Sequence, residues 1–264
     1  MYPRFLHIYG PLWINGYGLM IAIGFLLFTY LLYKSPMRSK LISAEQLFNL
    51  ISIGLIAGII GGRLFFVLSE FKYFSKNFLE IFYLWDGGFG ILGTILAVLV
   101  VVFIYLKLHK ITFLPLADLI SIYAPLMQSI SRLGCLFAGC CYGRVVSDYL
   151  PWAITFTNTD GLAPLNVALH PTQIYSSIAS FLIFLFLYFR SKYFSFKKGE
   201  ILFSYLLLES VSRFSVDIWR GDKDLVLNFP LAKDFFSLFS YSQLVAICLF
   251  IFALVGFVWV RIKK

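Results

Sequence analysis

Seven stretches of the chain are almost continuously apolar, and short polar segments separate them. Each stretch is close to the roughly 20 residues that a helix needs to cross the hydrocarbon core of a bilayer. Because the apolar residues are continuous instead of alternating with polar ones, they predict membrane-spanning helices and not the strands of a barrel. The expected spans are residues 16–33, 47–67, 88–106, 113–130, 174–189, 201–219 and 242–260.

Composition supports an all-α integral membrane protein. Of the 264 residues, 60% are hydrophobic and 13% are charged, and the mean hydropathy is +0.86. A soluble domain carries about 25% charged residues, so this chain lacks the charge to cover a water-facing surface. Its 19% aromatic content is also unlike that of a disordered chain. A soluble enzyme and a disordered protein are therefore excluded.

Basic residues are distributed unevenly between the two sets of segments that connect the spans. Twelve follow the first, third, fifth and seventh spans, whereas eight lie in the other set. Because Lys and Arg are enriched on the cytoplasmic side of membrane proteins, we expect the N-terminus outside and the C-terminus in the cytoplasm. An odd number of spans requires such a split. The net charge of +9 is accordingly attributed to topology, and no nucleic acid partner is expected.

The chain is expected to form a single polytopic membrane domain, residues 1–264, because no repeat or low-complexity linker divides it. The longest polar segment, residues 141–173, predicts a small insertion on the outer face between the fourth and fifth spans. The first span lacks a basic leader and a small-residue cleavage site, so we expect it to be retained.

Three arginines are placed where a membrane protein rarely carries them. Arg63 and Arg213 lie well inside spans, and Arg132 lies at the end of the fourth. Because an arginine at the bilayer centre costs about 2.5 to 3.5 kcal/mol, these side chains must face the interior of the bundle. They indicate an anion site, since guanidinium groups bind phosphate oxygens through paired hydrogen bonds. Alternatively, each arginine pairs with an intramembrane carboxylate. The candidates are Asp118, Glu209 and Asp217.

Glycines beside these cations favour the anion site. Two glycines precede Arg63, and Gly139 and Gly143 follow Arg132. A backbone without side chains can approach a ligand closely, and free N–H groups at helix ends favour phosphate. The nearest ligand of this kind in a membrane is an anionic phospholipid.

Three of the four cysteines, Cys135, Cys140 and Cys141, lie close together near the outer end of the fourth span, and Cys248 lies in the last span. The C-x4-C-C spacing matches no standard zinc pattern, so no metal is expected. Small buried side chains are the favoured interpretation, and metal binding is the alternative.

Several short motifs follow one another along the chain. They are YGLM at 17–20, GGR at 61–63, WDGG at 85–88, Asp118, Pro125, RLG at 132–134 with Gly139 and Gly143, PW at 151–152, HPTQIY at 170–175 and RFSVDIWR at 213–220. In this order, over nearly the whole chain, they resemble the prolipoprotein diacylglyceryl transferase family of bacterial membrane enzymes.

The resemblance implies a function. The diacylglyceryl group of phosphatidylglycerol passes to the lipobox cysteine thiol of a prolipoprotein signal peptide, and glycerol phosphate leaves, which is the first step of bacterial lipoprotein maturation. It implies a multi-pass protein of the bacterial plasma (inner) membrane and no cofactor. We expect Arg132 to bind the lipid phosphate, Arg213 to stabilise the leaving group, and Asp217 to orient Arg213 or Arg220. The expected substrate-binding residues are Arg132, Tyr17, Arg63, Gly143 and Arg220.

The sequence also departs from the family pattern. Leu92 stands where members commonly carry a histidine proposed to help with proton transfer, and Ser131 replaces the glycine before the arginine. Cys135, Ala138 and Cys140 stand where better-known members carry Asn, Asn and Glu. A diverged member that binds an anionic phospholipid, with another acceptor or without turnover, is therefore the alternative function. A polytopic transporter would explain the spans but not the ordered motifs.

Overall fold

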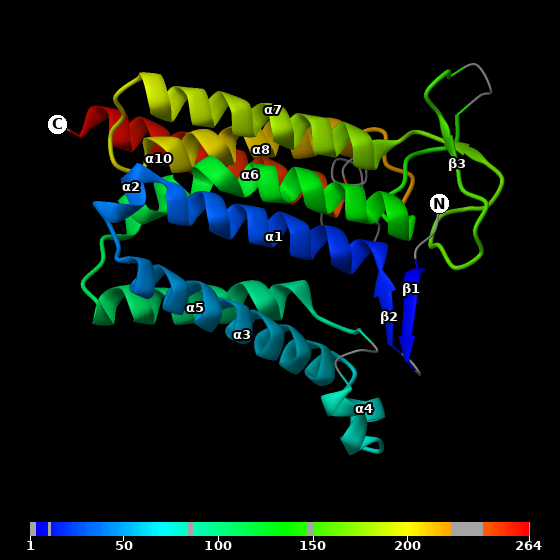
Figure 1. Ribbon diagram of the computed structural model, residues 1–264. Helices are drawn as coiled ribbons and strands as arrows, with labels where there is room; N and C mark the ends of the chain where they lie inside the picture. Colours follow the sequence, from blue (N-terminus) through cyan, green and yellow to red (C-terminus); the bar gives the residue numbers. More distant parts are fainter. Residues whose placement is uncertain (1–3, 10–11, 84–86, 147–149, 223–239, 264) are drawn as a thin grey trace, which may run out of the picture. The chain divides into compact units, whose positions relative to one another are not determined.

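The computed structural model describes residues 4–9, 12–83, 87–146, 150–222 and 240–263 (Figure 1). The described chain is mostly helical, as the apolar stretches predict. It divides into two compact units. The larger unit comprises Met1–Tyr9, Trp13–Leu32 and Ala117–Lys264, and the smaller unit comprises Gly10–Leu12 and Tyr33–Leu116.

The larger unit contains most of the long helices and nearly all strand residues. Its helices are α1 (Gly16–Lys34), α6 (Phe113–Ala138), α7 (Thr172–Tyr193), α8 (Glu200–Asp217) and α10 (Tyr241–Ile262); the last residues of α1 and the first residues of α6 are assigned to the smaller unit. Its strands are β1 (Arg4–Tyr9), β2 (Leu12–Asn15), β3 (Ile154–Thr155) and β4 (Ala168–Leu169). The smaller unit contains α2 (Pro36–Ser39), α3 (Ala44–Ser69), α4 (Phe71–Phe74), η1 (Phe78–Phe82) and α5 (Ile91–Leu108).

Six helices in the described chain are long and apolar enough to cross a membrane, namely α1, α3, α5, α6, α7 and α10. They coincide with six of the seven expected spans. The remaining expected span, residues 201–219, corresponds to α8, which packs against α7 and α10. Its charged residues Glu209, Arg213 and Asp217 and its serines make α8 more polar than the other six. The structure thus supports a helical membrane protein with six candidate spans.

Helix α6 is the most buried of the six spanning helices. Its Asp118 is fully buried, and both carboxylate oxygens accept backbone hydrogen bonds at the start of α8, from Gly199 at 2.6 Å and Leu202 at 2.8 Å. Asp118 therefore satisfies N–H groups that a helix start leaves without partners, and it caps α8 instead of pairing with an arginine. This contact joins α6 to α8.

Small polar side chains connect α6 to its other neighbours. Ser129 and Ser177 of α7 exchange hydrogen bonds, with each hydroxyl reaching the other residue's backbone carbonyl at 2.8 and 2.9 Å. Gln128 donates to Glu209 of α8 at 2.5 Å. Such hydrogen bonds and close contacts of small residues hold membrane helices together, because apolar burial gives little advantage inside lipid.

A shared carboxylate ties three helix ends of the larger unit. The Oε1 atom of Glu200 accepts from Arg190 at the end of α7, at 2.7 Å, and from Arg261 at the end of α10, at 2.9 Å. Glu200 begins α8 and is buried. Glu200 thereby joins the first residue of α8 to the C-terminal ends of α7 and α10.

In the smaller unit, α3 and α5 pack through glycines. A Cβ on Gly61 would overlap Ala97 and the Gly93 carbonyl, and a Cβ on Gly93 would overlap the Gly61 carbonyl. A Cβ on Gly62 would overlap the Thr94 hydroxyl. The two glycines before Arg63 therefore allow α3 to pack closely against α5. The sequence alone suggested that they let the backbone approach a ligand.

Within the segment expected to form an insertion, residues 141–173, the described residues pack onto the end of α6. Strands β3 and β4 pair antiparallel, with Ile154 opposite Leu169. Their apolar residues form a small core with Leu136 of α6. This core fixes the chain that leaves α6, where the candidate site lies.

Candidate functional site

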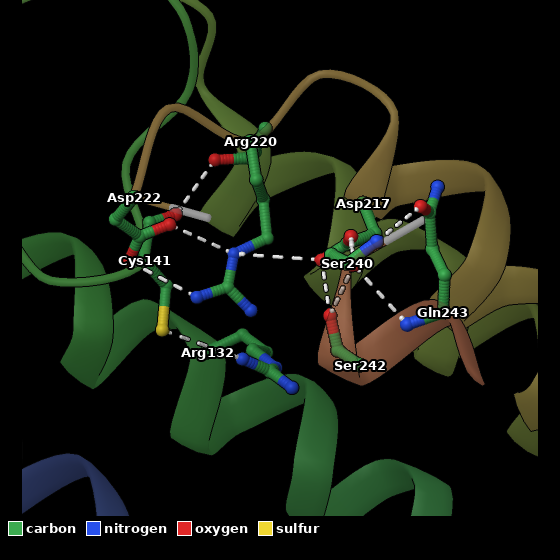
Figure 2. A network of polar contacts seen from close by, with 9 residues as sticks. Arg132, Cys141, Asp217, Arg220, Asp222, Ser240, Ser242 and Gln243 are labelled. Atoms are coloured by element: carbon green, nitrogen blue, oxygen red, sulfur yellow. Dashed lines mark hydrogen bonds and ion pairs between the residues drawn. The ribbon is translucent and has the colours of Figure 1, made fainter. Parts of the chain in front are cut away.

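A small pocket opens in the larger unit where the end of α6, the start of α7 and the end of α8 meet. Figure 2 shows the polar contacts around it. The pocket is lined by Arg132, Cys141, Thr172, Ser176, Arg213, Val216, Asp217 and Arg220. Four of the seven residues proposed from the sequence as site residues therefore share one pocket.

Two of its arginines form no hydrogen bond or ion pair with a carboxylate in the part of the chain that the structure describes. Arg132 contacts the Cys141 sulfur, with Nη1 3.9 Å from Sγ, and Arg213 has neither a hydrogen bond nor an ion pair there. Glu209, one turn from Arg213, is instead bound to Gln128, and its Oε2 atom is buried without a hydrogen bond. The alternative in which each arginine is neutralised by its own carboxylate is not found among these residues.

Asp217 ends α8 and contacts the start of α10. It is 1% exposed and accepts hydrogen bonds from the hydroxyls of Ser240 and of Ser242, the latter at 2.7 Å. Ser240 also caps α10, through a capping box with Gln243. The Arg220 Nε lies 3.8 Å from the Asp217 carboxylate (Figure 2). Asp217 thus fixes α10 against α8 and borders the pocket.

Arg220 is held on two sides. Its guanidinium binds Asp222 in a bidentate manner, with Nε–Oδ1 at 2.9 Å and Nη2–Oδ2 at 3.0 Å. Its backbone forms an antiparallel bridge with Gly143. A Cβ on Gly143 would overlap the His170 carbonyl, so only glycine fits this crossing of segments. Arg220 is therefore less available to a ligand than Arg132 and Arg213.

The turn after α6 brings three thiols together. The backbone is left-handed at Gly139, with φ +72°, and at Cys141, with φ +56°. As a result, the Sγ atoms of Cys135, Cys140 and Cys141 all lie within 4.8 Å of one another. Hydrogen bonds from the other two thiols, and then the nearby Arg220 and Arg132 guanidiniums, lower the pKa of Cys141 against the opposing effect of burial. The sequence placed the three cysteines close together along the chain, but the convergence of their thiols depends on this turn, which the spacing does not specify.

Tyr17 and Arg63, also expected to bind substrate, do not line this pocket. Tyr17 begins α1, is 44% exposed and lies beside α6, where a Cβ on Gly134 would come within 3.0 Å of the Tyr17 carbonyl oxygen. Arg63 belongs to the smaller unit and is 7% exposed. Its guanidinium donates to five backbone carbonyls, those of Glu80, Ile81, Tyr83, Gly87 and Gly88.

A guanidinium has five N–H donors, so these contacts use the full capacity of Arg63. The side chain holds η1 and the following glycines against α3. Trp85 and Asp86 of the motif expected at 85–88 lie outside the described residues. A substrate-binding role for Arg63 stays a prediction.

Comparison with known proteins identifies the family. The family model described as prolipoprotein diacylglyceryl transferase matches residues 3–259. A phosphatidylglycerol–prolipoprotein diacylglyceryl transferase of Clostridium tetani is 36% identical over 240 residues, which cover 91% of this chain and 94% of the relative. A second such transferase, of Clostridium perfringens, is 34% identical over 227 residues, 86% of each chain. The pocket, in which two guanidiniums form no ion pair with a carboxylate of the described chain, agrees with matches of this length, and the chain belongs to the prolipoprotein diacylglyceryl transferase family.

Proposed function

We propose that this protein transfers the diacylglyceryl group of phosphatidylglycerol to the lipobox cysteine thiol of a prolipoprotein and releases glycerol phosphate. The observation that carries the proposal is the pocket that Arg132 and Arg213 share, where neither forms a hydrogen bond or ion pair with a carboxylate of the described residues. The names of the relatives from Clostridium tetani and Clostridium perfringens give the same donor and acceptor.

In this reaction the arginines would stabilise the negative charge that develops on the leaving phosphate. The acceptor sulfur forms a bond to C3 of the diacylglyceryl group while the bond from C3 to the phosphate oxygen breaks. The electron pair of that bond leaves with glycerol phosphate, which gains one negative charge. Guanidiniums already placed beside the phosphate stabilise this charge more in the transition state than in the bound lipid, and so lower the barrier. Arg132 binds the phosphate, and Arg213 stabilises the departing oxygen.

The remaining site residues position this pair. Asp217, fixed by Ser240 and Ser242, orients Arg220 and the end of α8 that carries Arg213. Gly143 allows the close crossing that places Arg220. Tyr17, beside the end of α6, donates a hydrogen bond to the lipid headgroup.

An apolar groove on the same helix, α8, suits an acyl chain. It lies between α8 and α10 and is lined by Ser210, Val211, Phe214, Ser215, Ala246, Ile247 and Phe250. Phe214 directly follows Arg213 in α8. A lipid whose phosphate contacts Arg213 would have to pass one acyl chain around α8 to reach this groove.

Topology and location complete the proposal. The chain crosses the plasma membrane of a bacterium seven times, with α8 as the polar sixth span, the N-terminus outside and the C-terminus in the cytoplasm. The excess of basic residues after alternate spans supports this orientation. The site then lies near the outer leaflet, at the end of α6 where residues 141–173 begin.

One assay separates the candidate functions. Purified protein in nanodiscs containing phosphatidylglycerol is incubated with a lipobox peptide, and with the same peptide carrying Ser for Cys. A thioether-linked lipid on the cysteine peptide alone, detected by mass spectrometry, supports the transferase. Lipid binding without product would favour the diverged member, in which Leu92 replaces the family histidine. Flux of a soluble solute without either would favour a transporter.

A further inference from the structure

Three thiols that the proposed mechanism does not use have the spacing of metal ligands. Zn²⁺ binds cysteine sulfur at about 2.3 Å, so three thiolates around one ion lie about 4 Å apart. The Sγ atoms of Cys135, Cys140 and Cys141 already lie within 4.8 Å of one another. A shift of less than about 1 Å in each side chain therefore suffices to enclose an ion.

The backbone holds these thiols in place. Cys141 has φ +56°, a conformation that costs a non-glycine residue about 1 to 3 kcal/mol and persists where surrounding contacts impose it. Those contacts are visible: Thr172 donates to the Cys141 carbonyl at 2.7 Å, and Gln173 donates to the Cys140 carbonyl at 2.8 Å. The Cys140 N–H in turn bonds the Cys135 carbonyl at 3.1 Å. The three ligands are thus preorganised.

The local charge also suits a thiolate site. Zn²⁺ with three thiolates carries one net negative charge, which is costly to bury unless a cation is close. The Arg132 guanidinium lies 3.9 Å from the Cys141 sulfur, and Figure 2 shows the Arg220 guanidinium on the same side. All four cysteines are free thiols, so these three are able to bind metal.

We propose that Cys135, Cys140 and Cys141 bind one Zn²⁺ as three thiolates and leave its fourth position for the thiol of the incoming lipobox cysteine. Three protein ligands with one open position is the arrangement of catalytic zinc sites. This role rests on the proposed function, because it supplies the acceptor of that reaction. It also replaces the proton acceptor that Leu92 cannot provide.

The resulting step is balanced without a redox partner. A thiol that coordinates Zn²⁺ loses its proton, which passes to water. The bound sulfur then attacks C3 of the diacylglyceryl group, and the bond from C3 to the phosphate oxygen breaks. The electron pair leaves with glycerol phosphate beside Arg132, and the thioether product, a weak ligand, leaves the ion.

Metal binding is tested without any activity measurement. Reduced, chelator-stripped protein in detergent is titrated with Co²⁺, which reports tetrahedral thiolate coordination by its absorption, and Zn²⁺ is then added as competitor. We expect one Co²⁺ per chain with sulfur-to-cobalt charge transfer, displaced by Zn²⁺. Cys140→Ser and Cys135→Ser should weaken binding at least tenfold, whereas the matched control Cys248→Ser, in α10, should not. Absent charge-transfer absorption, or equal binding by a variant lacking all three cysteines, would overturn the site.

The open position is tested with the acceptor alone. Adding a lipobox peptide to the Co²⁺ protein should change the cobalt spectrum, and the peptide with Ser for Cys should not. This readout needs no lipid, so it stands even if transfer itself is never observed. Conversely, thioether formation at the same rate in metal-free and Cys140→Ser protein would overturn the zinc step and leave the transferase function intact.

Discussion

At the scale of single residues, the arginines differ by what surrounds them. Arg63 uses all five of its donors on backbone carbonyls, and Arg220 is bound by two carboxylates. Arg132 and Arg213 are the pair whose donors remain for a ligand in the described chain. A charged side chain in a membrane protein is therefore interpreted by counting its partners, and not by its depth alone.

Replacing Arg132 should lower the rate of lipid transfer more than it lowers the stability of the folded protein. We expect Arg132→Ala to reduce the rate of thioether formation about 10²- to 10³-fold, since it removes a donor to the developing charge. Arg132→Lys should recover part of the rate, because it restores the charge but not the paired hydrogen bonds. Lys198→Ala, which removes an exposed charge at the other end of α8, serves as the control. An undiminished rate in Arg132→Ala would refute the assignment.

Asp217 should be coupled to the serines of α10. Asp217→Asn weakens charge-assisted bonds to buried hydroxyls and should cost about 1 to 3 kcal/mol of stability. Combining it with Ser242→Ala should cost less than the sum of the two single changes, with a coupling of about 0.5 to 3 kcal/mol. Thermal unfolding in detergent measures all three variants. Strict additivity would show that the contact contributes nothing.

At the scale of helices, the apolar stretches correctly predicted where helices form, and local polar groups set their ends. Helix α3 begins at Ala44, before the expected residue 47, because Ser43 and Gln46 form a capping box. Helix α5 begins at Ile91, after the expected residue 88, because Gly87 and Gly88 are left-handed. Such ends depend on a few side chains that a hydropathy pattern does not register.

The sequence predicted those site residues whose polarity differs from that of their immediate neighbours in the chain. Arg132 and Arg213 were identifiable because a charge in an apolar stretch is conspicuous. Ser240 and Ser242, which fix Asp217, were not identified, although Ser240 and Gln243 have the spacing of a capping box. They lie more than 20 residues from Asp217 in sequence, so folding alone reveals that contact.

Two glycines of α3 should respond differently to replacement by alanine, because only one of them packs against α5. Gly61→Ala places a Cβ against Ala97 and the Gly93 carbonyl, and should destabilise the protein by about 1 to 3 kcal/mol. Gly54→Ala, in the same helix, meets nothing within 4 Å and should be neutral or slightly stabilising, since Ala favours helix. Unfolding temperatures of the two variants in detergent give the comparison. Equal temperatures would contradict the packing described for Gly61.

At the scale of the whole molecule, topology follows from the placement of charge. The C-terminal Arg261, Lys263 and Lys264 belong to the set of segments richer in basic residues. We therefore expect a fluorescent protein fused to the C-terminus to fold in the cytoplasm and emit, and an alkaline phosphatase fused there to be inactive. The reverse pattern would invert the orientation and place the pocket at the inner leaflet.

The polarity of α8 has a consequence for biogenesis. Glu209, Arg213 and Asp217 each oppose partitioning into lipid by up to about 3 kcal/mol near a helix centre, so α8 is a poor substrate for independent release from the translocon. Its neighbours α7 and α10 provide the packing surface and α10 provides the serines that bind Asp217. We therefore expect the nascent chain to keep α8 at the insertion machinery until α10 has been synthesised, so that synthesis of the last helix completes the candidate pocket.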